Sequence, residues 1–291
     1  MHQHADGPHG HEEDDDLPLS GLSRRNEKPE DLELPMSLLA ISVGNTNTRF
    51  TPFHLSHSHP GVSLPNANQV ALVEALSKAA AHLDADGRTA VVFASTNHVV
   101  RDELTELLTP RVNHEVYRIG IDLDIPIEHA LSDDAFEKTG QDRLLNALAA
   151  FDSLQEACVV VSAGTAITVD FIDGDGVFQG GAILPGLHAW LRAMHDSTSA
   201  LPLVEPAKPE DVPFGRDTRQ AMLQGAFYGI AGAVRHLVER YAEAFAAYPQ
   251  VWATGGDAEA LFGADEFINR IVPDLTLRGI ALTCKEALTN P

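Results

Sequence analysis

"AISVGNTNTRF" (residues 40–50) places five small polar residues between two apolar runs. The apolar run at 37–43 predicts a buried strand, and the run at 49–54 predicts its antiparallel partner. Small residues in the turn between them let backbone N–H groups approach an anion without an obstructing Cβ. The stretch therefore predicts a strand–turn–strand unit that binds an anionic group such as a phosphate.

The same pattern returns in the second half of the chain. "VSAGTAIT" (161–168) is similar to "ISVGNTNT" (41–48), because each is an apolar strand that ends in Ser, turns through Gly and Thr, and returns. A third glycine turn, "ATGGD" (253–257), suits a flat ring lying against bare backbone. One such turn usually closes an ordinary hairpin. Three in this order predict a nucleotide site, with a phosphate chain held between the first two turns.

The remaining periodicity predicts an α/β protein whose second half repeats the plan of the first. The halves are residues 36–150 and 151–291, and the helix at 139–154 bridges them. The "DGDG" turn (173–176) predicts a hairpin. Helices are predicted at 68–82, 101–108, 139–154, 186–197, 218–247, 258–261 and 280–288, and further strands at 89–95, 112–121, 157–162, 167–172, 177–184, 250–254 and 275–277.

Composition excludes several classes of function. Hydrophobic residues make up 44% of the 291 residues, as in a globular protein, and the net charge of −22 argues against nucleic acid as a partner. The two cysteines, Cys158 and Cys284, are too few for a disulfide framework and predict a reducing, cytoplasmic setting. We find no apolar stretch of membrane-spanning length and no signal-peptide pattern, so we predict no membrane partner.

Residues 1–35 form a separate, acidic and proline-containing segment. They have no apolar period and cannot bury enough surface to offset the entropy of ordering, which predicts a disordered tail. His2, His4, His9 and His11 stand near an acidic run, a composition that can hold a transition metal. A solvated tail is the simpler interpretation of the same residues.

The order of motifs resembles type III pantothenate kinase, a member of the acetate kinase, sugar kinase, Hsp70 and actin superfamily. The resemblance runs from about Leu38 to Leu288 and rests on "VGNTNT", "GQDR", "GTAITVD", "GGAILPGL", "FGRDT", "QGAFYGIAGAV" and "ATGGDAE". It implies two RNase H-like (actin-like ATPase) domains around an interdomain cleft. It also implies transfer of the γ-phosphoryl group of ATP to the terminal hydroxyl of pantothenate, the first step toward coenzyme A. The family is a homodimer that uses Mg²⁺ and a monovalent cation, K⁺ or NH₄⁺.

The resemblance assigns roles to individual residues. Asp142, in "GQDR", is implied to be the proton acceptor, and phosphoryl transfer does require a carboxylate near the attacking hydroxyl. Without the motif, Asp142 would be read only as a carboxylate favoured at a helix N-terminus. Thr218 is also a plausible N-cap of the long helix. The implied substrate contacts are Gly140, Gln141, Arg143 and Thr218, and the implied ATP contacts are Ser42, Gly44, Asn45, Thr46, Asn47, Thr48, Gly164, Thr165, Gly255 and Gly256.

The chain departs from the family pattern at two equivalent places. Ser42 and Ser162 stand where the family has Asp at the ends of its two phosphate strands, the second as a ligand of the monovalent cation. Ser offers a neutral oxygen where hard cations favour a carboxylate. Asp170, beyond Thr168 on the same strand face, is the nearest alternative metal ligand, although it is equally a hairpin-flanking Asp.

Three interpretations of this departure stay open. The protein is a kinase with rearranged metal ligands, a degenerate kinase that binds nucleotide or acts as a regulatory or interaction protein, or a kinase for another hydroxyl substrate. The retained Asp142 and Arg143 favour a working kinase. The "GQDR" and "FGRDT" blocks argue against another acceptor.

Overall fold

The structure is a computed structural model that describes residues 34, 37–54, 57–58, 60–83, 89–246 and 248–289. The predictions of a disordered tail at residues 1–35 and of a histidine metal site within it lie outside the described residues, except at residue 34. Leu34, which the sequence assigned to the tail, is buried in the same apolar cluster as Leu38.

The first sheet contains six strands among the described residues, in the order β3-β2-β1-β5-β6, with β4 paired to β2. The β1–β2 hairpin is antiparallel as predicted, whereas β1, β5 and β6 run parallel. The strands are β1 (Ser37–Val43), β2 (Asn47–His54), β3 (His57–Ser58), β4 (Val62–Pro65), β5 (Thr89–Ser95) and β6 (Glu115–Arg118).

The second sheet repeats this plan, with the order β11-β10-β7-β8-β9. As in the first sheet, consecutive strands pair antiparallel on one side: β7 with β8, and β8 with β9. On the other side of β7, strands β10 and β11 run parallel to it. This topology confirms the predicted α/β class with a duplicated mixed-sheet plan. The strands are β7 (Cys158–Ala163), β8 (Ala166–Ile172), β9 (Phe178–Pro185), β10 (Gln250–Thr254) and β11 (Arg270–Ile271).

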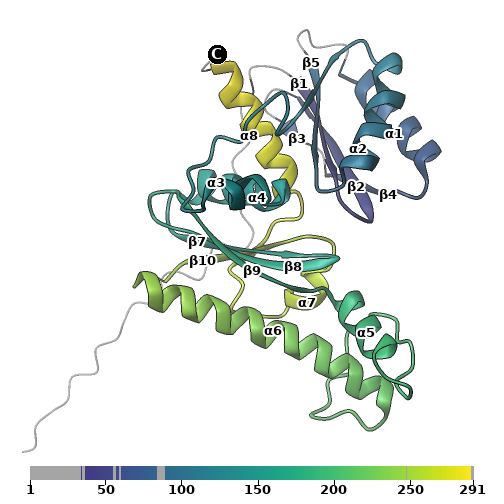
Figure 1. Ribbon diagram of the computed structural model, residues 1–291, viewed down its shortest axis with the longest axis vertical. Coiled ribbons are helices and arrows are strands. Elements are labelled where there is room, and N and C mark those ends of the chain that lie inside the picture. Colours follow the sequence, from purple (N-terminus) through teal and green to yellow (C-terminus); the bar gives the residue numbers. More distant parts are fainter. Residues whose placement is uncertain are drawn as a thin grey trace, which may run out of the picture.

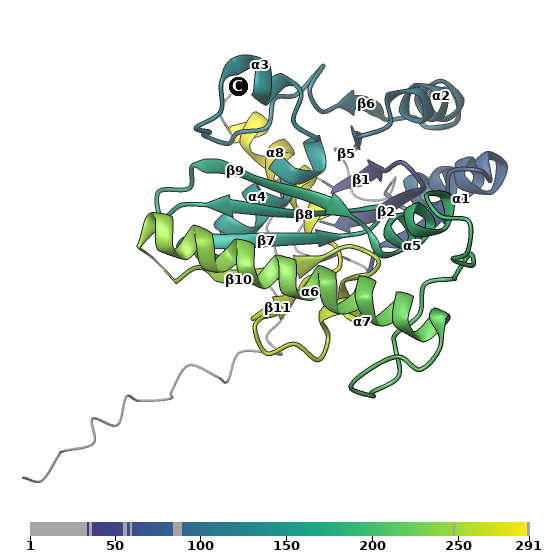
Figure 2. The same cartoon turned by 60° about the horizontal axis from the view of Figure 1, so that its bottom comes forward.

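Helices form layers on both sides of the two sheets (Figure 1). Helices α1 and α2 cover the outer face of the first sheet, and α6 runs along the outer face of the second, as Figure 2 also shows. Helices α4 and α8 lie between the sheets. The helices are α1 (Gln69–Ala81), α2 (His98–Leu108), α3 (Asp133–Glu137), α4 (Gln141–Leu154), α5 (Leu187–Asp196), α6 (Thr218–Phe245), α7 (Ala258–Phe262) and α8 (Leu275–Thr289), with a short 3₁₀ turn at Thr109–Arg111.

The middle layer is shared by both halves of the chain. Leu277 and Ile280 of α8 pack in the apolar cluster that contains Leu38 of β1, whereas Leu275 of α8 packs in the cluster that contains Trp252 of β10. Helix α8 therefore follows the second sheet in sequence but covers the first sheet as well. The division of the chain at residue 150 stays a prediction.

The prediction of a strand at 275–277 is wrong, because those residues form the first turn of α8. Since α8 is buried against both sheets, apolar residues point to opposite sides of the helix and obscure its 3.6-residue period. The strand of this region is β11, only two residues long and earlier in the chain.

Candidate functional site

The first turn connects β1 to β2 and is held from outside by Asn66. The N–H of Gly44 donates to the carbonyl of Asn47 at 2.9 Å, which closes the turn. Asn66 then donates its side-chain amide to the Gly44 carbonyl at 2.8 Å and its backbone N–H to the Thr46 carbonyl at 2.9 Å. The hydroxyl of Thr48 donates to Oδ1 of Asn66 at 2.8 Å. Thr48 is thus buried against Asn66, whereas Thr46 and Asn47 are exposed.

The second turn connects β7 to β8 and is held by direct backbone packing. The N–H of Gly186 donates to the carbonyl of Thr165 at 3.1 Å, and a Cβ on Gly186 would lie 2.0 Å from the Gly164 carbonyl oxygen. Gly255, at φ +98°, approaches the end of β7 so closely that a Cβ would lie 2.2 Å from the Ala163 carbonyl oxygen. Both contacts require glycine.

The two turns meet. The hydroxyl oxygens of Thr46 and Thr165, 119 residues apart in sequence, lie 3.1 Å from each other, and both residues are exposed. This separation is far below the limit of roughly 15 Å that one triphosphate with its ions can span. The sequence repeat therefore places two polar turns within reach of a single polyphosphate chain.

Asp142 lies in the first turn of α4, close to the end of β5. Its Oδ1 accepts the N–H of Arg143 at 3.0 Å. A Cβ on Gly140 would lie 2.6 Å from that Oδ1 and 3.6 Å from the Thr96 methyl carbon. Burial raises the pKa of the Asp142 carboxyl, against the opposing effect of Arg143. A carboxylate with a raised pKa is a stronger proton acceptor.

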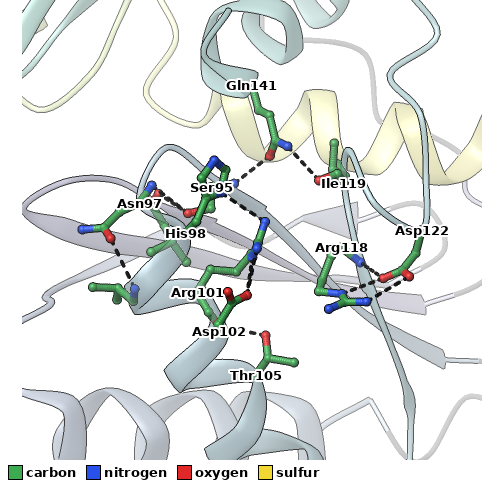
Figure 3. A network of polar contacts seen from close by, with 12 residues as sticks. Ser95, Asn97, His98, Arg101, Asp102, Thr105, Arg118, Ile119, Asp122 and Gln141 are labelled. Carbon is green, nitrogen blue, oxygen red and sulfur yellow. Dashed lines mark hydrogen bonds and ion pairs between the residues drawn. The ribbon is translucent and has the colours of Figure 1, made fainter. Parts of the chain in front are cut away.

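Gln141 fixes the start of α4 to the first sheet (Figure 3). Its Oε1 accepts the N–H of Ser95 at 2.9 Å, and its Nε2 donates to the carbonyl of Ile119 at 2.7 Å. The amide also lies over Gly120, where a Cβ would be 2.5 Å from Nε2. Gln141 is a predicted substrate contact, but both polar atoms of its side chain are hydrogen-bonded to backbone groups at the ends of β5 and β6.

Arg143 points toward the second sheet and pairs with Asp170. Its Nε donates to both carboxylate oxygens of Asp170, at 2.9 and 3.2 Å, and a second guanidinium nitrogen also contacts Asp170. The Asp170 side chain is only 2% exposed. Burial raises the pKa of its carboxyl, and the guanidinium of Arg143 opposes this shift. A metal ion would reach Asp170 only if Arg143 moved away.

The groups near the two turns are mostly neutral oxygens. Ser42 lies across from Arg49 on β2, Ser162 lies across from Thr168 on β8, and both serines are partly exposed. No cluster of three or more His, Cys, Asp or Glu side chains in the described part of the chain is arranged to hold a metal ion. This donor set does not form a carboxylate cage. It fits a hydrated Mg²⁺ that arrives on the ATP phosphates, because Mg²⁺ keeps several waters when substrate phosphates bind it.

Thr218 is the first residue of α6 and is exposed. The prediction that it caps this helix is wrong, since the side chain of Asp217 accepts the N–H of Gln220 at 2.8 Å and is the N-cap. Asp also ranks above Thr as an N-cap. Among the described residues, no hydrogen bond connects Thr218 to the "GQDR" motif.

The sequence reasoning missed two residues that shape the turns. Asn66 lies in a polar loop 22 residues after Gly44, and nothing in its local sequence signals the contact. Gly186 lies within the quoted "GGAILPGL" motif, and the glycine after a Pro-terminated strand was the available signal. No helix in the described ranges is long and apolar enough to cross a membrane.

Comparisons with known proteins agree with these motifs. A family model described as type III pantothenate kinase matches residues 38–240. A type III pantothenate kinase of Rhodospirillum rubrum is 33% identical over 258 residues, which cover 84% of this chain and 96% of that protein. Another, of Akkermansia muciniphila, is 32% identical over 250 residues, or 85% and 98% of the two chains.

Solved structures show the same fold at low identity. A Baf family protein of Campylobacter jejuni is 20% identical, with a TM-score of 0.56 over 86% of this chain and 99% of that chain. An activator of 2-hydroxyisocaproyl-CoA dehydratase from Clostridium difficile is 11% identical, with a TM-score of 0.50 over 87% and 96% of the two chains.

Proposed function

We propose that this chain, which belongs to the type III pantothenate kinase family, phosphorylates the terminal hydroxyl of pantothenate with ATP, the first step toward coenzyme A. The observation that carries the proposal is the contact between Thr46 and Thr165, because it brings the two small-residue turns to one point. The γ-phosphoryl group of MgATP is the group transferred.

The two turns bind the phosphates. Backbone N–H groups and hydroxyls come from Asn45, Thr46 and Asn47 in the first turn and from Gly164 and Thr165 in the second. All of these residues are exposed except Gly164, which is half-buried. The adenosine lies against Gly255 and Gly256. The support for this placement is that a Cβ on Gly256 would meet nothing within 4 Å, so the backbone is open to a ligand there.

Asp142 accepts the proton of the attacking hydroxyl. As that oxygen bonds to the γ-phosphorus, the bond to the bridging oxygen of ADP breaks, and the proton passes to the Asp142 carboxylate. The raised pKa of Asp142 suits this role. The substrate contacts are Gly140, Arg143, Thr218 and the backbone of Gln141, because the side-chain amide of Gln141 is already bound to Ser95 and Ile119. The Asp170 carboxylate holds the Arg143 guanidinium in place.

Mg²⁺ comes bound to ATP, and a monovalent cation, K⁺ or NH₄⁺, acts beside Ser162. The cation's effect is weaker than in relatives with a carboxylate at this position, because a serine hydroxyl adds no negative charge. Asp170 serves as a metal ligand only in a state in which Arg143 has released it. Comparing turnover in K⁺ and in Na⁺, for the natural chain and for Ser162→Asp, measures this dependence.

We extend the proposal to a homodimer located in the cytoplasm. One face of α6 is uncovered: Ala221, Gly225 and Gly232 are exposed, a Cβ on either glycine would meet nothing within 4 Å, and Tyr228 between them is 53% exposed. Such a face allows the close approach of a second copy. It also lies on the helix whose first residue is Thr218, so a partner chain would bring its own Thr218 near the interface.

The dimer is tested by light scattering at micromolar concentration. Tyr228→Glu places a charge on the uncovered face of α6 and should yield a monomer. Tyr248→Glu is the matched control, because Tyr248 is fully exposed on a loop outside that face. A natural chain that is monomeric at this concentration contradicts the dimer.

The kinase is tested by ATP consumption that depends on pantothenate, with Asp142→Asn as the inactive control. Ser42→Asp separates the working from the degenerate kinase. A working enzyme already holds MgATP, so the added carboxylate, which would lie opposite Arg49, should leave turnover level or lower it. A clear rise would show that the natural chain is degenerate. Nucleotide binding without pantothenate-dependent turnover in any variant would replace the kinase by a nucleotide-binding function.

A further inference from the structure

We propose that Asn66 is a positioning residue that holds the first turn in the shape required for phosphate binding. The inference rests on the proposed function of that turn. Asn66 itself is no ligand of the nucleotide in this proposal, since its two side-chain polar atoms are both used within the protein.

Asn66 contacts the turn at three separate points. Its side-chain nitrogen donates to the Gly44 carbonyl, its backbone N–H donates to the Thr46 carbonyl, and its side-chain oxygen accepts the Thr48 hydroxyl. Thr48 is 0% exposed, so the last bond is shielded from water. The three bonds, all 2.8 to 2.9 Å long, bridge both ends and the middle of the turn.

These bonds also fix the direction of the donors that a phosphate would use. In a planar trans peptide the C=O of one residue and the N–H of the next point in opposite directions. Because the carbonyls of Gly44 and Thr46 point toward Asn66, the N–H groups of Asn45 and Asn47 point away from it. Two donors with a fixed, shared orientation form the kind of concavity that binds anions.

The second turn meets the first at the residue between these donors. Thr46 lies between Asn45 and Asn47, and its hydroxyl is the group that lies 3.1 Å from Thr165. A change in the orientation of the first turn would therefore change the direction of its own N–H donors and also its distance to the second turn. Among the described residues, Asn66 opposes such a change through its three hydrogen bonds to the turn.

The neighbouring Asn68 provides a matched control. It is two residues away, exposed, and its side chain accepts the N–H of Ala71 at 3.3 Å as the N-cap of α1. Both asparagines thus stabilise local backbone, but only Asn66 contacts the turn. A purely structural role would give Asn66 and Asn68 variants similar losses of melting temperature and no difference in nucleotide affinity.

The experiment measures binding of a non-hydrolysable MgATP analogue by calorimetry, together with the KM for ATP and for pantothenate. We expect Asn66→Ala to weaken analogue binding and raise the KM for ATP by about 10- to 30-fold, the effect of losing two hydrogen bonds, with the KM for pantothenate changed less than about twofold. Asn68→Ala should change none of these constants by more than about twofold. Equal analogue affinities in the two variants would overturn the inference.

Three further variants, Asn66→Asp, Thr48→Val and the double variant Thr48→Val/Asn66→Ala, protect the test against misfolding. Asn66→Asp keeps the shape and the acceptor for Thr48 but points an oxygen at the Gly44 carbonyl, so it should weaken analogue binding at least as much as Asn66→Ala. The double variant Thr48→Val/Asn66→Ala should weaken analogue binding by less than the sum of the two single effects. The reason is that each substitution removes the same hydrogen bond, between the Thr48 hydroxyl and Oδ1 of Asn66. Strictly additive losses contradict the proposed link through Thr48.

The outcomes separate this inference from the kinase proposal. A natural chain that binds the analogue but does not phosphorylate pantothenate refutes the kinase, and the asparagine comparison still decides the role of Asn66. A natural chain that does not bind the analogue overturns both.

Discussion

The two turns that meet at Thr46 and Thr165 arise from similar sequences but are supported in different ways. The first is held by side-chain hydrogen bonds from Asn66, and the second by the close approach of Gly186 and Gly255 to its backbone. Side-chain bonds can be lost singly, each at a modest cost. Glycine contacts tolerate no added carbon, because a Cβ would overlap a carbonyl oxygen. The second turn is therefore the less adaptable of the two.

The largest expected effect distinguishes the rate of phosphoryl transfer from nucleotide binding by either turn. Asp142→Asn should lower turnover by about two to four orders of magnitude, as removal of a general base does, while leaving analogue binding unchanged. Because the natural carboxyl has a raised pKa, turnover of the natural enzyme should fall as pH drops through that pKa. Steady-state kinetics across pH check this. An unchanged acid limb in Asp142→Asn would assign it to another group.

The same substitution should stabilise the fold at neutral pH. A carboxyl whose pKa is raised by folding contributes stability below its unfolded pKa, and loses that contribution as pH rises through the folded value. The asparagine side chain cannot ionise, so Asp142→Asn should melt at a higher temperature than the natural chain at pH 7. A lower melting temperature would mean that the ionised carboxylate is stabilised by its neighbours.

The next effect concerns the buried ion pair that joins α4 to β8 of the second sheet. Asp170→Asn leaves the Arg143 guanidinium without its buried partner and should cost about 3–5 kcal/mol of unfolding free energy, as breaking buried pairs does. Asp134→Asn is the control, because its pair with Lys138 is exposed and should contribute almost nothing. Chemical denaturation measures both. Equal losses would show that burial does not distinguish the two pairs.

A smaller effect tests the glycine support of the second turn. Gly255→Ala forces a side chain onto a φ of +98° and against the Ala163 carbonyl, which should cost about 1–3 kcal/mol. Gly174→Ala, in the β8–β9 hairpin turn, adds its methyl to open space and should be nearly neutral. If Gly255→Ala is as harmless as Gly174→Ala in denaturation, the contrast between the two turns is lost.

The smallest effect concerns the contact between the turns. Thr165→Val removes one exposed hydroxyl bond and should raise the KM for ATP about two- to tenfold, the range for a single neutral hydrogen bond. Thr109→Val removes an exposed hydroxyl that bonds to backbone at the end of α2 and should leave that constant unchanged. A larger loss in Thr109→Val would point to a general effect on the fold.

The sheet strands were largely predictable because their apolar runs end at clear turns. Strands β1, β5 and β10 have the predicted bounds, since each is a continuous buried run followed by small or polar residues. Helix α8 was not predictable in its first turn, because a helix buried on two sides loses the polar face that reveals its period. Helix α8 is buried on two sides because it lies between the two sheets, and no local sequence pattern predicts that position.

The site was predictable as far as motifs reach. The meeting of the turns follows from the repeat. The catalytic role of Asp142 stays a prediction from the resemblance of "GQDR". The contacts of Gln141 and Asn66 were not predictable, because their partners lie 46 and 22 residues away and involve backbone atoms, whose identity leaves no trace in sequence. The pairing of Arg143 with Asp170 likewise depends on how α4 lies on β8.

The shared middle layer has a consequence for how the protein is made. The face of β1 that carries Leu38 and Ala40 is covered by Leu277 and Ile280 of α8, which the ribosome adds after every other described element. At about 5–20 residues per second, synthesis leaves that apolar face without its α8 residues for roughly 10–50 s. The first half therefore completes its apolar core only after α8 emerges. Until then, the exposed part of that core is a surface through which nascent chains can associate.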